Sequence, residues 1–190
     1  MLLTLTGGSG AGKTTLAHAL TATAPQLSTQ LLHGDAYYFE TPERGGVWMR
    51  DDAGVPHLDY GMPQSVDLRR LTHDTEVALA KAAVVIVEGL FAHHVAPAPH
   101  WPRLGIFLDL PADLRLVRKI QRKCLHHGFP LETLLCNYLH HRRAAHERHV
   151  EPARAHSDLI LDGTLPTDTL ARQVWSRAGL LRVDDAWKSA

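Results

Sequence analysis

The segment Gly7-Gly8-Ser9-Gly10-Ala11-Gly12-Lys13-Thr14 constrains the fold more than any other part of the sequence. It satisfies the P-loop spacing G-x-x-x-x-G-K-[ST] in full, and Thr15 follows it. The apolar run 2–6 precedes it directly, and a helical pattern begins at Lys13. A buried strand, a glycine-rich turn and a helix N-terminus form a cradle of N–H groups for phosphates. We therefore expect an α/β domain that binds a nucleotide through residues 7–15.

The residue types in this segment favour ATP and Mg²⁺ as cofactors. Glycines allow the backbone to wrap closely around phosphate groups, and the helix N-terminus adds a partial positive charge. Lys13 would contact the β- and γ-phosphates, and the hydroxyl group of Thr14 would bind Mg²⁺. A glycine-rich turn that matches by chance is the alternative, which the Lys-Thr-Thr ending and the preceding strand disfavour.

Short apolar runs alternate with amphipathic segments along the rest of the chain. Strands are expected at 2–6, 30–33, 83–87, 105–108 and 159–161, and helices at 13–22, 67–82, 131–149 and 167–178, with a further helix after Pro111. Residues 40–64 are rich in glycine and proline and predict a long irregular loop. Nearly continuous apolar strands between helices indicate a parallel sheet covered on both faces. We expect one domain over residues 1–190 with a three-layer P-loop NTPase fold around a five-stranded parallel sheet.

The overall composition disfavours several kinds of partner. Basic and acidic residues number 20 each, so no net charge favours nucleic acid or an anionic membrane. No apolar stretch approaches the roughly 20 residues of a membrane-spanning helix, and the N-terminus lacks a signal-peptide pattern. Neither the two cysteines nor the 14 histidines have metal-site spacing. We expect a cytoplasmic protein with a small-molecule substrate and no nucleic-acid or membrane partner. Whether it forms a homo-oligomer stays open.

Two acidic residues follow predicted strands beside the phosphate site. Asp35 comes just after strand 30–33, and Glu88 follows strand 83–87. The carboxyl ends of parallel strands border the crevice in which α/β sheets bind ligands. Asp35 would therefore either accept the proton of a substrate hydroxyl group or cap a turn, and position alone does not choose between these roles.

A basic stripe follows Pro111. At 100° per residue, four cationic side chains fall within about a quarter of the helix circumference, namely those of Arg115, Arg118, Lys119 and Arg122. The apolar side chains, with Cys124 among them, lie on the other side, so Cys124 is expected to be buried. The stripe is either a solvated surface or a lid, at approximately residues 111–130, that closes over ATP and neutralises charge on the transferred group.

P-loops occur in kinases, GTPases and ATPases. The chain has no N-K-x-D segment for reading guanine, and its strand 83–87 is followed by Glu88 rather than Asp. The joint presence of Asp35, Glu88 and the basic stripe favours a small-molecule kinase. A regulatory nucleotide-binding protein is disfavoured because Asp35 and Lys13 are both retained. A nucleic-acid-related ATPase is disfavoured by the zero net charge.

Motifs along nearly the whole chain resemble the uridine kinase and phosphoribulokinase family of P-loop kinases. Residues 7–15 are similar to its GGSxSGKTT, residues 35–38 to its D-S-F-Y, and residues 88–90 to its E-G-I. Residues 58–67 resemble its F-D-H-P-D-A-F-D with a small insertion. Residues 113–122 follow D-x-R-L-x-R-R-x-x-R, and residues 151–160 resemble P-x-K-x-Y-A-D-x-I-I.

This resemblance implies a nucleoside-kinase-like P-loop fold with an Arg-rich lid, and ATP-dependent transfer to a substrate hydroxyl group. Asp35 would be the general base, with Tyr38, Asp59 and Glu88 also in the substrate site, and Glu88 would support Mg²⁺ through water. The resemblance further implies that the lid residues Arg115, Arg118 and Arg122 assist the transfer together with Lys13, and that loop 162–166 lies near the adenine.

The sequence departs from the uridine kinases at the acceptor site. Those kinases have a β-hairpin between the D-A-F-D segment and the E-G strand, and its Tyr and His hold the pyrimidine. Here the residues after Asp67 read as a single helix. Lys123 stands where the family usually has Asp, and His127 where it has Arg. A nucleoside such as uridine is the first candidate acceptor, and nicotinamide riboside, pantothenate, a sugar phosphate or another small alcohol are the alternatives.

Overall fold

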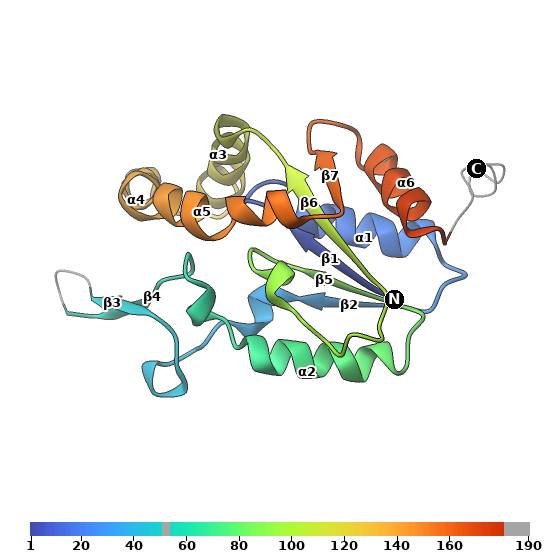
Figure 1. The fold of residues 1–190 in the computed structure, drawn as a ribbon. Helices are drawn as coiled ribbons and strands as arrows, with labels where there is room; N and C mark the ends of the chain where they lie inside the picture. Colours follow the sequence, from blue (N-terminus) through green and yellow to red (C-terminus); the bar gives the residue numbers. More distant parts are fainter. Residues whose placement is uncertain (51–53, 181–190) are drawn as a thin grey trace.

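A five-stranded parallel sheet forms the centre of the computed structural model, which describes residues 1–50 and 54–180 (Figure 1). The strand order is β2-β5-β1-β6-β7, with β1 (Leu2–Thr6) in the middle. β5 (Val84–Glu88) and β6 (Arg103–Asp109) pair with β1, while β2 (Thr29–His33) and β7 (Leu159–Asp162) form the edges. The predicted five-stranded α/β fold is confirmed, and the P-loop leaves the sheet at its central strand.

Helices cover both faces of the sheet. α1 (Lys13–Thr23) and α6 (Thr167–Ala178) lie on one face, and α2 (Leu68–Leu79) lies on the other (Figure 1). Because both faces are covered, successive strand residues are buried alternately against one helical layer and the other. Buried side chains on the α1–α6 side include Leu3, Leu5, Ile86 and Ile106, and those on the α2 side include Leu2, Val85, Val87 and Phe107.

Helix α2 begins where the sequence predicts. The carboxylate of Asp67 accepts a hydrogen bond from the Arg70 backbone N–H (3.0 Å), which satisfies one of the free donors of the first turn. Leu71, Thr75 and Ala78 form the buried side of the helix. The segment between Asp67 and β5 therefore holds a helix and no β-hairpin, as expected.

Three further helices stand over one end of the sheet. They are α3 (Ala112–Ile120), α4 (Leu131–Asn137) and α5 (Arg143–His149). One π-helical turn (Gln121–Leu125) follows α3, and another (Tyr138–Arg142) joins α4 to α5, so residues 131–149 form the continuous helix that the sequence predicts. Single 3₁₀ turns complete the helical content, at Gly34–Tyr37, Pro42–Arg44, Pro63–Ser65, Ala92–His94 and Glu151–His156.

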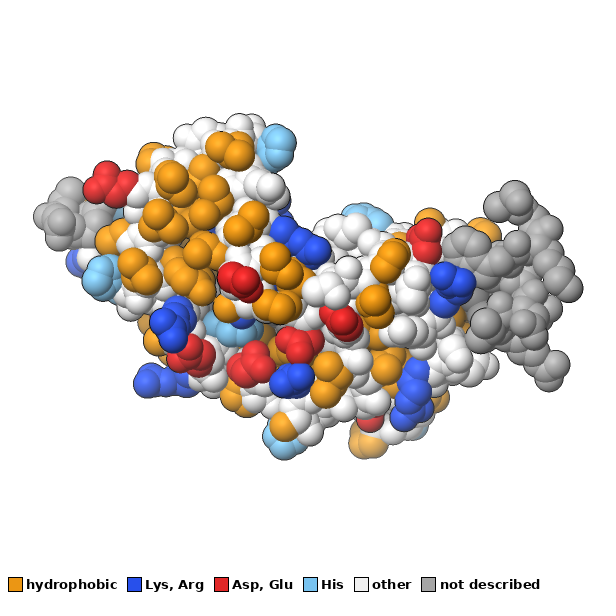
Figure 2. Space-filling view, turned by 90° about the horizontal axis from the view of Figure 1, so that it is seen from above, with side chains coloured by type: hydrophobic (Ala, Val, Ile, Leu, Met, Phe, Trp, Pro, Cys, Tyr) orange, Lys and Arg blue, Asp and Glu red, His pale blue; other side chains and the backbone are white. Residues whose placement is uncertain are grey.

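The expectation that Cys124 is buried is wrong. Its side chain is only partly buried. The apolar side of α3 does not pack on the sheet, since Leu114 and Val117 are 41% and 50% exposed. Figure 2 shows hydrophobic side chains gathered over the end of the molecule that α3 to α5 form. The basic side of α3 is the one that faces inward.

Residues 40–64 are less irregular than their glycines and prolines suggest. β3 (Trp48–Arg50) and β4 (Pro56–Leu58) form an antiparallel hairpin. The indole N–H of Trp48 donates to the Gly45 carbonyl oxygen (2.7 Å), and the side chain of Leu58 in β4 is buried. Such short strands depend on tertiary contacts, which cannot be predicted from residue propensities.

No helix in residues 1–50 and 54–180 is long and apolar enough to cross a membrane.

A partly buried histidine makes stability depend on pH. Nδ1 of His93 is buried and has no hydrogen-bond partner among the described residues, and burial lowers the His93 pKa to about 4. An unfolded histidine takes up a proton near pH 6.5, so between about pH 6.5 and 4 the unfolded chain binds more protons. As the pH is lowered through this window, we expect the free energy of unfolding to decrease. His93 should account for roughly 1–2 kcal/mol of this decrease, after allowance for its partial exposure.

Urea unfolding of the wild type and His93→Asn at pH 7 and pH 5 measures this effect. The loss of stability on going to pH 5 should be smaller in His93→Asn. His73→Asn, at an exposed position of α2, is the matched control and should behave like the wild type. An equal loss in all three proteins would show that His93 does not carry the effect.

Candidate active site

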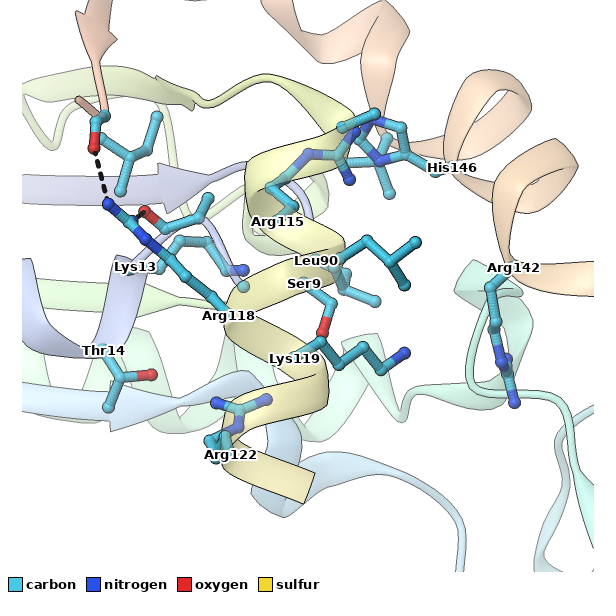
Figure 3. Close-up of a pocket in the computed structure, with 18 of the residues that line it drawn as sticks. Ser9, Lys13, Thr14, Leu90, Arg115, Arg118, Lys119, Arg122, Arg142 and His146 are labelled. Carbon is cyan, nitrogen blue, oxygen red and sulfur yellow. Dashed lines mark hydrogen bonds between the residues drawn. The ribbon is translucent and has the colours of Figure 1, made fainter. Parts of the chain in front are cut away.

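A cavity of about 1330 Å³ opens at the carboxyl end of the sheet. The P-loop and the start of α1 form its floor, α3 forms one wall, and the helix of residues 131–149 forms the opposite wall (Figure 3). Asp35, Tyr38 and Tyr60 complete the side nearest β2 and the hairpin. Eight basic and five acidic side chains line the cavity, which gives it a local positive charge in a chain with no net charge.

The P-loop glycines are required by its geometry. Gly10 and Gly12 have φ values of 88° and 103°, a region that side chains disfavour. A Cβ atom at Gly10 would also lie 2.6 Å from the backbone oxygen of Arg115. The loop therefore packs directly against the first turn of α3, and Gly10 allows this approach.

The side chain of Lys13 points back into the P-loop. Its side chain is buried, and Nζ donates to the carbonyl oxygens of Gly7 (3.0 Å) and Gly8 (3.1 Å). Burial lowers the pKa of Lys13, while the charges of Glu88 and Asp35 act in the opposite direction. The arrangement holds one ammonium group at the floor of the cavity.

Glu88, the last residue of β5, contacts one residue of α1 and one residue of β2. Its Oε1 atom accepts a hydrogen bond from the Thr14 hydroxyl group (3.1 Å) and lies 2.9 Å from Nδ1 of His33. The side chain of Glu88 is nearly fully buried. His33 is a contact that sequence reasoning missed, although the register aligns it with Glu88 on the adjacent strand.

The oxygens at this point fit a magnesium ion. Mg²⁺ prefers oxygen ligands, keeps several waters and is often held by one or two protein groups together with substrate phosphates. The Thr14 hydroxyl group and the Glu88 carboxylate meet these requirements beside the P-loop. Within the described residues no cluster of three or more His, Cys, Asp or Glu residues forms a separate metal site.

The Mg²⁺ assignment predicts a measurable change in Glu88→Gln. Glutamine keeps the size of the side chain but removes its charge, so the Mg²⁺ concentration for half-maximal activity should rise by about 10- to 100-fold. The measurement is a Mg²⁺ titration at saturating ATP. Glu147→Gln, at the far wall of the cavity, is the control. An unchanged Mg²⁺ requirement in Glu88→Gln would remove Glu88 from the metal site.

Asp35 lies on the 3₁₀ turn after β2, and Tyr38 lies at the end of that turn. Both residues line the cavity. The Asp35 side chain is exposed to the cavity, and its charge acts on Lys13 and on Tyr38. The Tyr38 hydroxyl group donates to the Tyr60 carbonyl oxygen (3.0 Å). Burial, followed by the charge of Asp35, raises the pKa of Tyr38, so this side chain remains a neutral donor. The exposed carboxylate of Asp35 is therefore available to a ligand.

The predicted basic residues of α3 face the cavity. Arg115 lies over Gly8 and donates from Nε to the Leu110 carbonyl oxygen (2.9 Å). Arg118 donates to the carbonyl oxygens of Ala11 (3.3 Å) and Gly163 (3.4 Å), and thus joins the P-loop to the loop after β7. Arg122 also lines the cavity, and its charge lowers the pKa of Lys13.

Asp59 does not line this cavity. Its Oδ1 atom accepts hydrogen bonds from Nη1 of Arg142 (2.8 Å) and from the Gly61 backbone N–H (2.9 Å). The neighbouring Tyr60 and Gly61 line the cavity instead. In this structure Asp59 therefore holds Arg142, which itself faces the cavity.

The wall formed by residues 131–149 was missed by sequence reasoning. It contributes Tyr138, Arg142, Arg143, His146 and Glu147. The density of basic residues in this helix is the only signal in the sequence, and it does not indicate which way the helix faces. Burial, followed by the charge of Arg115, lowers the pKa of His146, which lies 3.1 Å from a Glu151 carboxylate oxygen.

Residues 51–170 match the model of the phosphoribulokinase/uridine kinase family. Uridine kinases are among the relatives: that of Staphylococcus epidermidis is 30% identical over 84% of this chain and 86% of its own, and that of Borrelia turicatae is 28% identical over 84% and 85%.

Solved kinase structures share the fold. A sugar kinase from Janibacter sp. superposes with a TM-score of 0.60 at 20% identity and covers 94% of both chains. Shikimate kinase from Acinetobacter baumannii superposes with a TM-score of 0.57 at 17% identity and covers 95% of both chains. This chain belongs to the phosphoribulokinase/uridine kinase family and is an ATP-dependent small-molecule kinase.

Proposed function

We propose that this chain transfers the γ-phosphate of ATP to a hydroxyl group of a small metabolite bound beside Asp35. The observation that carries the proposal is the meeting of three groups at one cavity. They are the Lys13 ammonium group in the P-loop, the exposed Asp35 carboxylate, and the basic side of α3. Transfer from an anionic phosphate donor to a neutral hydroxyl group needs cationic groups on the donor side of the transferred phosphate and a carboxylate on the acceptor side.

Each group has a distinct role in the proposed reaction. The P-loop N–H groups and Lys13 bind the phosphates, and Arg115, Arg118 and Arg122 offset the charge that spreads over the transferred group. Asp35 accepts the proton of the attacking hydroxyl group. Mg²⁺, held by Thr14 and Glu88, would neutralise phosphate charge. Tyr38 and Tyr60 provide an aromatic edge for the acceptor, with ring centroids 4.9 Å apart.

We also propose that residues 1–190 form one kinase domain with a lid over residues 111–130. The contacts of Arg118 with the P-loop and with the loop after β7 support this, because they fix the lid over the nucleotide side of the cavity. Such a closure excludes water, which would otherwise receive the phosphate.

A nucleoside such as uridine is the reference acceptor, because uridine kinases are among the relatives. Nicotinamide riboside, pantothenate and sugar phosphates are the alternatives. They are favoured by the absence of a hairpin between Asp67 and β5, since α2 occupies that segment.

ATP consumption with Mg²⁺ across these acceptors tests the proposed function. We expect a strong signal with one acceptor class and a background rate without acceptor. Consumption that no acceptor stimulates would contradict the proposal, provided that ATP still binds.

A further inference from the structure

Two groups can be distinguished among the cationic residues of the cavity. Arg115 and Arg118 lie at the nucleotide end, where they contact or cover the P-loop. Arg142 lies beside the Tyr60 ring and its charge acts on Tyr38, and the same charge acts on Lys119, which also lines the cavity. Figure 3 shows Lys119 extending from α3 toward Arg142, which comes from the helix on the opposite wall. The second group is thus placed for a ligand other than the ATP phosphates.

Lys119 has an excess of positive neighbours. Burial lowers its pKa first, and the charges of Arg142, Arg122 and Lys123 lower it further. Among the described residues, every neighbouring charge that acts appreciably on Lys119 is therefore a cation. Such a cluster is unfavourable by itself and becomes favourable when an anion binds between its members.

Arg142 is held in a fixed position. Asp59 accepts one of its hydrogen bonds at 2.8 Å, and Asp59 is itself fixed by the Gly61 backbone N–H. The Arg142 guanidinium group lies 5.8 Å from the centre of the Tyr60 ring. A guanidinium group has five N–H donors, so the bond to Asp59 leaves others for a second oxyanion. Asp59 would then be a positioning residue that acts through Arg142.

Together, these observations point to the chemical class of the acceptor. We infer that the acceptor carries a phosphate or carboxylate group, away from the hydroxyl group that is phosphorylated, and that Lys119 and Arg142 bind this anionic group. The inference rests on the proposed kinase function and narrows its substrate. It favours an acidic alcohol over a neutral nucleoside.

Matched acceptor pairs test the inference. Pantothenate against pantothenol, and ribulose 5-phosphate against ribulose, differ in whether one position carries an anionic group or a neutral hydroxyl group, so the product is identified by the position that is phosphorylated. With Mg²⁺ and ATP, the acidic member of at least one pair should give a kcat/KM at least about tenfold above its neutral partner. Equal or better turnover of neutral acceptors would overturn the inference while leaving the proposed function intact.

Two variants locate the anionic group. Lys119→Met and Arg142→Gln should each raise the KM for the acidic acceptor by about 10- to 100-fold, with the KM for ATP within about twofold of the wild type. Lys119→Met is the safer variant, because Lys119 makes no hydrogen bond or ion pair with the described residues and methionine fills much of the space of its stem. Lys81→Met, at an exposed position, is the control. If the KM for ATP rose instead, the cluster would serve the nucleotide and the inference would be wrong.

A binding measurement covers the case in which no acceptor in the panel is turned over. Inorganic phosphate is titrated calorimetrically into protein saturated with Mg²⁺ and a non-hydrolysable ATP analogue. We expect saturable binding that Lys119→Met and Arg142→Gln weaken at least about tenfold and Lys81→Met leaves unchanged. No binding, or equal binding by all variants, would overturn the inference independently of catalysis.

Discussion

Replacing Asp35 by Asn is expected to lower the turnover number by a factor of about 10²–10⁴, the range for loss of a general base. The Asp35 carboxylate is exposed to the cavity, so asparagine fits without a packing change but cannot accept the proton. ATP binding should stay within about twofold, because the P-loop and Lys13 are untouched. Single-turnover rates and nucleotide titration measure the two quantities separately.

The matched control for this variant is Asp168→Asn, an exposed carboxylate in the first turn of α6. It should have wild-type turnover. Near-normal turnover in Asp35→Asn would leave Asp35 as a turn residue after β2 and would require another base in the cavity.

Replacing Lys13 has the second large effect. Lys13→Ala removes a buried ammonium group that contacts the carbonyl oxygens of Gly7 and Gly8 at the floor of the cavity. Loss of one preorganised charge at the phosphates should lower the rate of transfer by about 10²–10³-fold and also weaken ATP binding. In this respect it differs from Asp35→Asn, in which binding is kept.

Lys13→Met separates charge from volume. Methionine fills much of the space of the lysine stem, so the fold should be kept while phosphate binding is lost. Thermal unfolding checks the fold, and Lys81→Met is the surface control. Retained activity in Lys13→Met would contradict the assignment of the P-loop to the phosphates.

The sheet and the nucleotide side of the site follow from the sequence for a physical reason. Both depend on local patterns: apolar runs for strands, and the glycine spacing for the loop. The meeting of Thr14 and Glu88 is also predictable, because the carboxyl ends of parallel strands come to the same edge of the sheet. Helix α2 is predictable from the Asp67 cap and its buried side.

The acceptor side depends on long-range contacts. Arg142 and Asp59 are 83 residues apart, and their hydrogen bond exists only because the helix of residues 131–149 crosses over the hairpin region. The sequence predicts that helix but not the side that faces the cavity. The β3–β4 hairpin is likewise stabilised by the burial of Leu58 in β4 and by the hydrogen bond of Trp48 in β3, and not defined by a turn signal.

Transfer of labelled γ-phosphate from ATP to an acceptor tests the central claim most directly. The protein is incubated with Mg²⁺, γ-labelled ATP and each acceptor, and products are separated and identified by mass. We predict that label appears on an acceptor hydroxyl group with the wild type and is lost with Asp35→Asn. Label that appears only as inorganic phosphate, at the same rate with and without every acceptor, would contradict the kinase function.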